Sequence, residues 1–330
     1  MGQPRSGTTK LESILEADED MLCLKMYEIR FPYLTLQYLF DLVGYIDSHY
    51  LTGAIDKFMR DYKLYNCFIE YDPERAQMRR IRYDLADEDD VTFLLNFFIH
   101  FQLVGAFPDP KLTHYLHHFD ELSKLDKIRM LKFHRRAVQK VLYRRGATKR
   151  YFGKWVLSWC GVTQEAFEVY PDLKLLVMTR DPQDQLRSWF KLQSLLSKDM
   201  AGVNCLERSK DVLEELKKIN IQFYQNEIDL LTTLDPSSRL IFNFQDYYRD
   251  IQGNTRILYD FLGKKIVAGS KFEKFLAEQT QQQLTHKVTT TDDTYITSQE
   301  IKARFPDLPT ILAKLDDRTK PKPTKDAKEE

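Results

Sequence analysis

The chain opens with Met1-Gly2-Gln3-Pro4-Arg5-Ser6-Gly7-Thr8-Thr9. A Gly, four residues and then Gly-Thr-Thr have the spacing of a phosphate-binding loop, in which backbone N–H groups at a helix N-terminus point at a phosphate. The nucleotide-kinase form of this loop has Lys directly after the second Gly, where this sequence has Thr8 and the nearest cation is Arg5. Short Gly, Ser, Thr and Pro stretches are also common in ordinary turns, so the interpretation depends on the residues downstream.

The composition is that of a globular protein without a strongly charged surface. The 330 residues are 43% hydrophobic, and Lys plus Arg and Asp plus Glu both number 49. This balance gives no reason to expect a nucleic-acid partner. The four cysteines are widely spaced and form no C-x-x-C pair, which disfavours a zinc site, and no metal is expected. We find no apolar run of transmembrane length and no signal peptide. The sequence as given predicts a cytoplasmic protein, or a protein of the Golgi lumen if an N-terminal anchor is missing from it.

The rest of the sequence alternates between strand and helix patterns. Leu11, Ile14 and Leu15 fall on one face at helical spacing, so a helix is expected from Thr8 to about Ala17. Strands are expected at 21–30, 151–157, 173–179 and 239–244, and further helices at 91–101, 126–145, 163–169, 184–196, 209–232 and 254–262. Strands that alternate with helices are typical of a parallel sheet covered on both faces. The expected fold class is therefore α/β, with a P-loop parallel sheet flanked by helices.

The expected organisation is one domain over residues 1–317, with a helical insert at about 34–145. Residues 318–330 contain Lys, Pro and Glu without large apolar side chains, and are expected to form a disordered charged tail. A phosphate-binding loop normally follows a buried strand. Only Met1 precedes Gly2, so the first strand of the fold is expected to be missing, either because the sequence is incomplete or because the loop is supported in another way.

A second anion-binding pattern follows the strand expected at 173–179. Thr179-Arg180-Asp181-Pro182 comes directly after it, and Ser188 lies eight residues beyond Arg180 within a helix. Ligands bind at the carboxyl ends of strands in sheets of this kind. The alternative is that Arg180 pairs with a neighbouring Asp and that Ser188 is an ordinary helix residue.

Together the two patterns resemble the donor site of sulfotransferases that use 3′-phosphoadenosine-5′-phosphosulfate (PAPS). The resemblance covers most of the chain. Within the family, the motifs are most similar to those of the bacterial and protein-tyrosine sulfotransferases. It implies that Arg5, Ser6, Gly7, Thr8 and Thr9 bind the 5′-phosphosulfate, with Arg5 stabilising the leaving phosphate, and that Arg180 and Ser188 bind the 3′-phosphate. It also implies that Lys287, in a late His-Lys segment, contacts the 3′-phosphate. Magnesium is not required for this chemistry.

Sulfuryl transfer needs a base to remove the acceptor's proton. Glu28, in Tyr27-Glu28-Ile29-Arg30, is similar to the segment that supplies the catalytic Glu of protein-tyrosine sulfotransferases, with Arg30 stabilising charge beside it. The alternative is a surface Glu–Arg pair at the end of a strand. His117 and His118 are the histidines worth testing, because other sulfotransferases use a His base.

The sequence departs from the family in one further place, and it leaves other functions open. Many members carry Lys-x-Pro where this chain has Ser158-Trp159-Cys160, so a cation is absent unless Lys154 replaces it. A nucleotide kinase of the same fold and an inactive, truncated relative that acts as a binding protein are the alternatives. The acceptor could be a protein tyrosine, a carbohydrate or a small alcohol, and a homodimer is possible.

Overall fold

A computed structural model describes residues 1–64, 82–89, 109–117, 119–156, 159–283 and 294–304. The described part is mixed α/β, mostly helical, with two small parallel sheets. β1 (Met21–Leu22) pairs with β2 (Arg150–Tyr151), and β3 (Leu175–Thr179) pairs with β4 (Arg239–Asn243). In the second sheet Leu175 faces Arg239 and Thr179 faces Asn243, so both strands end at the same edge.

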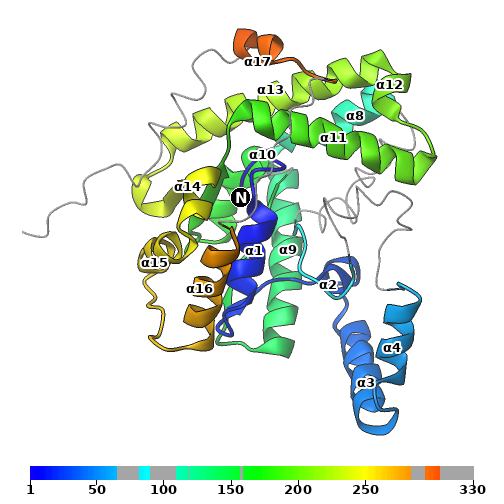
Figure 1. The fold of residues 1–330 in the computed structure, drawn as a ribbon, viewed down its shortest axis with the longest axis vertical. Coiled ribbons are helices and arrows are strands. Elements are labelled where there is room, and N and C mark those ends of the chain that lie inside the picture. The colour runs from blue at the N-terminus through cyan, green and yellow to red at the C-terminus, as the bar shows by residue number, and fades with distance from the viewer. Residues whose placement is uncertain (65–81, 90–108, 118, 157–158, 284–293, 305–330) are drawn as a thin grey trace, which may run out of the picture.

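The remaining elements are helices that surround these sheets (Figure 1). They are α1 (Thr8–Glu16), α2 (Met26–Arg30), α3 (Leu34–Tyr50), α4 (Ala54–Asp61), α8 (Pro110–His117), α9 (Lys124–Arg145), α10 (Trp159–Val169), α11 (Pro182–Ala201), α12 (Cys205–Arg208), α13 (Lys210–Thr233), α14 (Phe244–Arg249), α15 (Ile251–Phe261), α16 (Lys271–Gln283) and α17 (Ser298–Arg304). Two 3₁₀ turns lie at Phe119–Glu121 and Pro236–Ser238. None of the described helices has an apolar stretch long enough to cross a membrane.

The sheet of β3 and β4 is covered on both faces, as the sequence predicts. Val177 and Ile241 belong to a core cluster with α10, α11 and α13, whereas Met178 and Phe242 belong to another with α1, α14, α15 and α16. Successive residues of a strand point to opposite faces, so each strand supplies both clusters and must be apolar throughout. This double burial explains the unbroken apolar run of β3.

Met1 provides the support for the loop that follows it. Its amine donates a hydrogen bond to the Leu176 carbonyl at 2.6 Å, and its carbonyl accepts one from the Met178 N–H at 2.9 Å. These two bonds flank Val177 in the pattern of a parallel ladder. Met1 thus pairs with β3 at the point where a phosphate-binding loop is normally preceded by a strand, the strand that the sequence analysis expects to be missing.

One expected strand is wrong. Residues 21–30 contain only the two-residue β1, and Met26–Arg30 form the short helix α2. The Lys25 N–H donates to Glu28 Oε2 at 2.8 Å, which satisfies a backbone donor at the start of α2. Glu28 therefore lies in the first turn of a helix rather than at the end of a strand. The expected strand at 151–157 is likewise shorter, because β2 ends at Tyr151.

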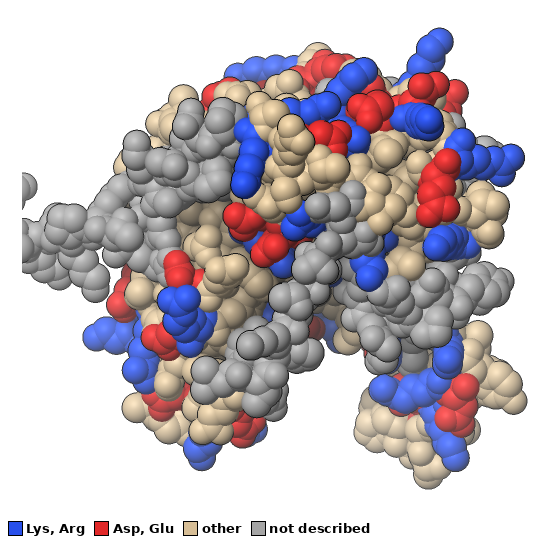
Figure 2. All heavy atoms as spheres, turned by 45° about the horizontal axis from the view of Figure 1, so that its top comes forward, with Lys and Arg blue, Asp and Glu red and all other residues tan. Residues whose placement is uncertain are grey.

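α3 and α4 form an arm that projects from the body at the lower right of Figure 1. Asp47 in α3 accepts hydrogen bonds from the N–H groups of Ile55 (2.7 Å) and Asp56 (2.9 Å), which joins the arm's two helices. Many large apolar side chains of the arm are exposed, for example Leu42 at 53% and Tyr45 at 52%. In Figure 2 the lower end of the arm is formed by uncharged side chains, and acidic and basic side chains are interspersed over the rest of the arm and of the visible face.

Candidate anion-binding site

The loop of residues 2–7 leads into α1 through two left-handed residues. Arg5 has φ 71° and Gly7 has φ 96°, and Gly7 is the N-cap of α1. A Cβ on Gly7 would collide with the Phe244 ring, so only glycine fits there. The N–H groups at the start of α1 carry the positive end of the helix dipole, which suits an anion.

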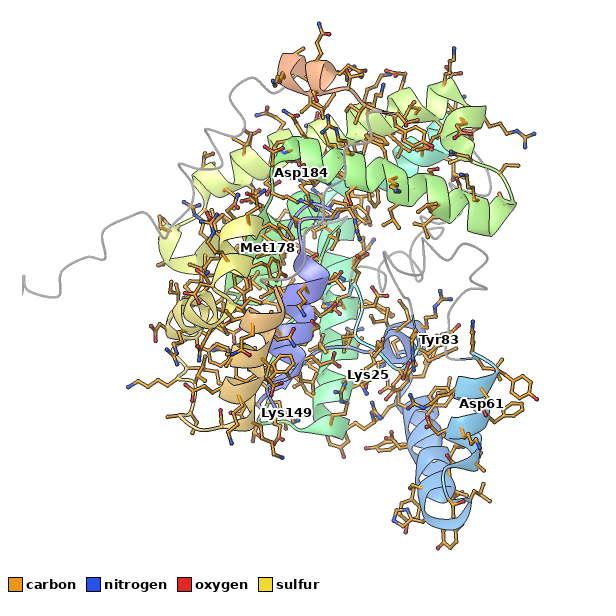
Figure 3. All side chains as sticks on the ribbon, in the orientation of Figure 1. Lys25, Asp61, Tyr83, Lys149, Met178 and Asp184 are labelled. Atoms are coloured by element: carbon orange, nitrogen blue, oxygen red, sulfur yellow. The ribbon has the colours of Figure 1, made fainter. Side chains whose placement is uncertain are left out.

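The two predicted anion-binding patterns, about 180 residues apart, meet in the structure. Arg5 Nε donates to Ser188 Oγ at 3.0 Å, and Arg180 Nη1 donates to the Arg5 carbonyl at 3.0 Å. Gln185 Nε2 also donates to the Pro4 carbonyl. Figure 3 labels Met178, near the end of β3, and Asp184, in the first turn of α11, the two elements that the Arg180 segment connects. The loop and the start of α11 therefore form one site.

Arg180 occupies its position because of strand register. β3 and β4 end together, so Arg180 and Phe244, the residues that follow them, are neighbours, and the guanidinium lies 4.8 Å from the ring centroid. The side chain is 9% exposed, and burial lowers the pKa of its guanidinium, with Asp184 at 4.0 Å acting in the opposite direction. Its Nε has no hydrogen-bond partner among the described residues. A buried cation with an unused donor is suited to an anionic ligand.

A cavity of about 220 Å³ lies at this junction. Its lining includes Arg180, Phe244 and all residues from Pro4 to Lys10 except Ser6, which lies behind the lining. Ser6 is fully buried, and its Oγ has no hydrogen-bond partner within the described part of the chain. The cations, helix N-terminus and unsatisfied polar atoms fit a ligand with negatively charged oxygens.

Lys154 lies beneath the loop. Its Nζ donates to Thr9 Oγ1 at 2.9 Å and approaches Glu12 at 3.3 Å and Glu88 at 3.7 Å. Its side chain is only 4% exposed. Burial raises the pKa of Glu12 to about 7, and Lys154 acts against this shift. Lys154 therefore contacts the start of α1, although Glu12 and Glu88 lie close to its charge and it does not line the cavity.

Glu28 and Arg30 lie outside the residues that line this cavity. Glu28 is fully buried and forms ion pairs with Arg144 and, at 2.9 Å, with Arg145. Tyr27 OH lies 3.3 Å from Glu28 Oε1. The Arg30 guanidinium lies 5.7 Å from the Tyr83 ring centroid. Figure 3 places Tyr83 near Lys25, at the foot of the arm.

Sequence reasoning missed the acidic segment Asp87-Glu88-Asp89, which is buried beside the site. Glu88 lines the cavity, and Asp89 accepts a hydrogen bond from Tyr151 OH. Burial raises the pKa of Asp89, and His134 Nε2 lies 3.6 Å from it. The sequence carried no signal for this burial, because consecutive acidic residues are expected on the surface.

Several sequence-predicted residues cannot be placed. Lys287 and His118 lie outside the described residues, as do residues 318–330, and the side chain of His117 also falls outside the description. Within the described ranges no group of three His, Cys, Asp or Glu side chains could hold a metal ion.

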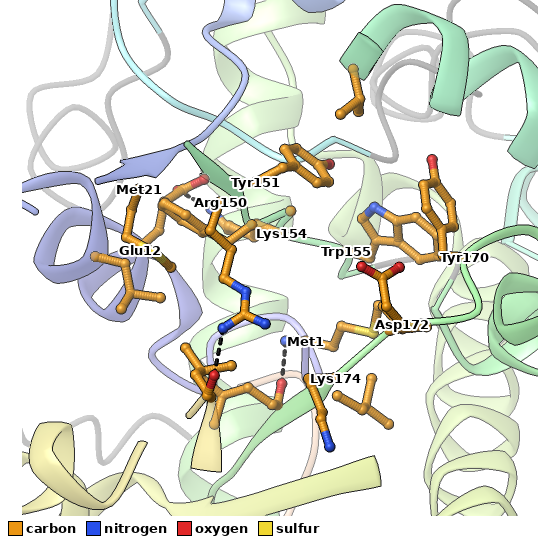
Figure 4. Close-up of a pocket in the computed structure, with 18 of the residues that line it drawn as sticks. Met1, Glu12, Met21, Arg150, Tyr151, Lys154, Trp155, Tyr170, Asp172 and Lys174 are labelled. Carbon is orange, nitrogen blue, oxygen red and sulfur yellow. Dashed lines mark hydrogen bonds and ion pairs between the residues drawn. The ribbon is translucent and has the colours of Figure 1, made fainter. Parts of the chain in front are cut away.

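A larger cavity of about 410 Å³ lies between β2 and β3 (Figure 4). Its lining includes Met1 and apolar side chains such as Trp155 and Leu175. It also includes charged side chains, among them those of Arg150, Lys154, Asp172 and Lys174. Arg150 Nη1 donates to the Leu262 carbonyl at 2.6 Å across one side of it. Neither Arg5 nor Arg180 lines this cavity, so it is separate from the junction of the two anion-binding patterns.

Comparison with known proteins agrees with this geometry. The family model described as "Sulfotransferase family" matches residues 1–266. The fold is similar to crystal structures of sulfotransferase STF9 from Mycobacterium avium (17% identity, TM-score 0.64, covering 94% of this chain and 75% of that one) and of sulfotransferase STF1 from Mycobacterium tuberculosis H37Rv (16%, 0.63, 92% and 74%). The search of curated proteins found no match.

Proposed function

Because the chain belongs to the sulfotransferase family, we propose that it transfers a sulfuryl group from PAPS to an acceptor hydroxyl. The observation that carries the proposal is the junction of Arg5, Ser188 and Arg180. It joins the residues expected at the two phosphates of the donor into one site, although they are distant in sequence. A ligand with a single phosphate would not require both halves.

In this proposal the loop binds the 5′-phosphosulfate. When the sulfuryl group leaves, negative charge develops on the 5′-phosphate, and Arg5 with the N–H groups of Gly7, Thr8 and Thr9 stabilises it. Preorganised donors of this kind contribute about 10²–10³-fold each to turnover in enzymes of acyl transfer. Lys154, through Thr9, adds positive charge beneath the same loop.

Arg180 and Ser188 would bind the 3′-phosphate. The unused Nε of Arg180 and the hydroxyl of Ser188 are the donors that would face it. This second phosphate distinguishes PAPS from ATP, so the same pair would supply donor specificity. We retain Lys287 as a further 3′-phosphate contact proposed from the sequence.

The base proposed from the sequence is Glu28, with Arg30 beside it. In the described structure both Glu28 oxygens are engaged by Arg144, Arg145 and the Lys25 N–H. To accept a proton, Glu28 would have to release one of these partners. If Glu28 is the base, Glu28→Gln should remove turnover and leave nucleotide binding intact, and normal turnover would rule this assignment out.

The acceptor is an oxygen nucleophile, and we propose a protein tyrosine, a carbohydrate hydroxyl or a small alcohol. All three present a hydroxyl that must lose its proton to the same base. Release of 3′-phosphoadenosine-5′-phosphate (PAP) from PAPS, measured with one acceptor of each class, identifies which is used.

We also propose that two copies associate through the arm of α3 and α4. The exposed Leu39, Leu42 and Tyr45 require an apolar partner. A second copy supplies an identical apolar surface, so a two-fold contact would cover both at once.

The function is tested by thermal stabilisation. PAP without metal should raise the melting temperature, since a ligand at 100 times its Kd stabilises the native state by about 2.7 kcal/mol. Stabilisation only by ATP with magnesium would indicate a nucleotide kinase instead. No stabilisation by either would indicate an inactive relative.

A further inference from the structure

We infer that Glu88 is the carboxylate that removes the acceptor's proton, an inference that rests on the sulfuryl transfer proposed above. Glu88 lines the same cavity as Arg5, Thr9 and Arg180. Among the described residues that line this cavity, it is the one carboxylate. A base must lie within reach of the acceptor hydroxyl, and that hydroxyl must lie beside the phosphosulfate.

The surrounding backbone fixes the position of Glu88. Ala86 forms a bridge with Lys25, and the Asp89 N–H donates to the Lys154 carbonyl at 2.8 Å. The Glu88 N–H itself lies 2.7 Å from Asp87 Oδ1. Residues 86–89 therefore join the start of α2 to the segment after β2 and hold Glu88 beside the loop.

The charge balance of the cavity supports a chemical role. A carboxylate beside an anion site weakens binding of a phosphorylated ligand, so a purely structural role would favour a neutral side chain there. Lys154 offsets the charge at 3.7 Å, but it lies closer to Glu12, at 3.3 Å. The Glu88 carboxylate therefore stays in the cavity although it lowers the affinity of the site for the anionic donor.

Glu28 lacks these features. Its two oxygens contact Arg144 and Arg145, and its side chain has no exposed surface. These contacts neutralise Glu28 and make it a link between α2 and α9. Glu28 is also absent from the residues that line the cavity, whereas Glu88 is one of them.

The proposed step is balanced as follows. A Glu88 oxygen takes the proton of the acceptor hydroxyl while the acceptor oxygen forms a bond to sulfur. The bond between sulfur and the 5′-phosphate oxygen breaks, and its electron pair stays on that oxygen, near Arg5. The products are the sulfate ester, PAP and protonated Glu88, which returns its proton to water.

The test compares Glu88→Gln with Glu28→Gln, and uses the exposed Glu121→Gln as a matched control. PAP affinity is measured by calorimetry, folding by the melting temperature, and turnover by PAP release from PAPS with phenol, glucosamine and a tyrosine peptide as acceptors. Glu88→Gln should bind PAP about fivefold more tightly, because a negative charge leaves the pocket. It should lose at least about 100-fold in turnover, whereas Glu121→Gln should match the wild type in both.

The outcomes separate this inference from the proposed function. If the wild type does not bind PAP, the donor proposal fails. If PAP binds but Glu88→Gln binds it no more tightly, or turns over normally, Glu88 is not the base. Should Glu88→Gln lower the melting temperature strongly, Glu88→Asp keeps the charge and retracts the carboxylate by one carbon. That variant should fold, bind PAP like the wild type and lose most of its turnover, and normal turnover would overturn the inference.

Discussion

Replacement of Arg180 by Ala should weaken PAP binding far more than binding of adenosine 5′-phosphate. The guanidinium is 9% exposed, and its Nε has no partner among the described residues. A hydrogen bond to a charged group is worth about 1.5–3 kcal/mol, so losing the contact to a 3′-phosphate should raise the Kd for PAP about 10- to 150-fold. Adenosine 5′-phosphate has no 3′-phosphate and should lose little.

The assay is calorimetric titration of both nucleotides into wild type and Arg180→Ala, with the melting temperature as a check on folding. Arg180 also donates to the Arg5 carbonyl, so some loss at the 5′ end is expected for both ligands. The difference between the two ligands isolates the 3′-phosphate contact, and Arg249→Ala, an exposed position, is the matched control. An equal loss for both nucleotides would refute the assignment of Arg180 to the 3′-phosphate.

Three further predictions concern the loop, the buried acid and the arm. Gly7→Ala should destabilise the protein by more than about 1–3 kcal/mol and abolish PAP binding, because the added methyl group collides with the Phe244 ring. Gly263 is also at positive φ but faces open space, so Gly263→Ala should cost only about 1 kcal/mol and leave PAP binding unchanged. Equal melting temperatures for the two variants would contradict this. The pKa of Glu12 is raised to about 7 in the folded state, so the native state binds more protons than the unfolded chain between about pH 4.5 and 7, and stability should fall as the pH rises through this window. Glu12→Gln should flatten that slope in denaturant titrations, and an unchanged slope would rule Glu12 out as its source. Leu42→Glu should halve the mass seen by light scattering if the arm joins two copies, and a wild-type monomer at micromolar concentration would contradict the homodimer.

The main elements of the fold were predictable because they depend on local pattern. The apolar run of β3 and the helical spacing in α1 each mark one element, and the Arg-Asp-Pro segment marks the end of a strand. General rules for parallel sheets then place the residues after β3 near a ligand. The direct contact of Arg5 with Ser188, a 3.0 Å hydrogen bond, was not predicted from the sequence.

The rest depended on contacts between distant segments. Residues 21–30 alternate like a strand, but Glu28 satisfies the Lys25 N–H, and α9 supplies its arginine partners, so a helical turn forms instead. The position of Glu88 depends on Ala86 meeting Lys25. No local period carries that information, so an acidic run that looks like surface is buried at the site.

The pairing of Met1 with β3 also governs how the protein should be produced. The Met1 nitrogen donates to the Leu176 carbonyl, and Met1 also lines the cavity between β2 and β3. A tag joined directly to Met1 would therefore start beside β3 and within reach of the loop. A tag at the other end leaves this pairing undisturbed, so the two tagged forms should be compared for PAP binding before any variant is measured.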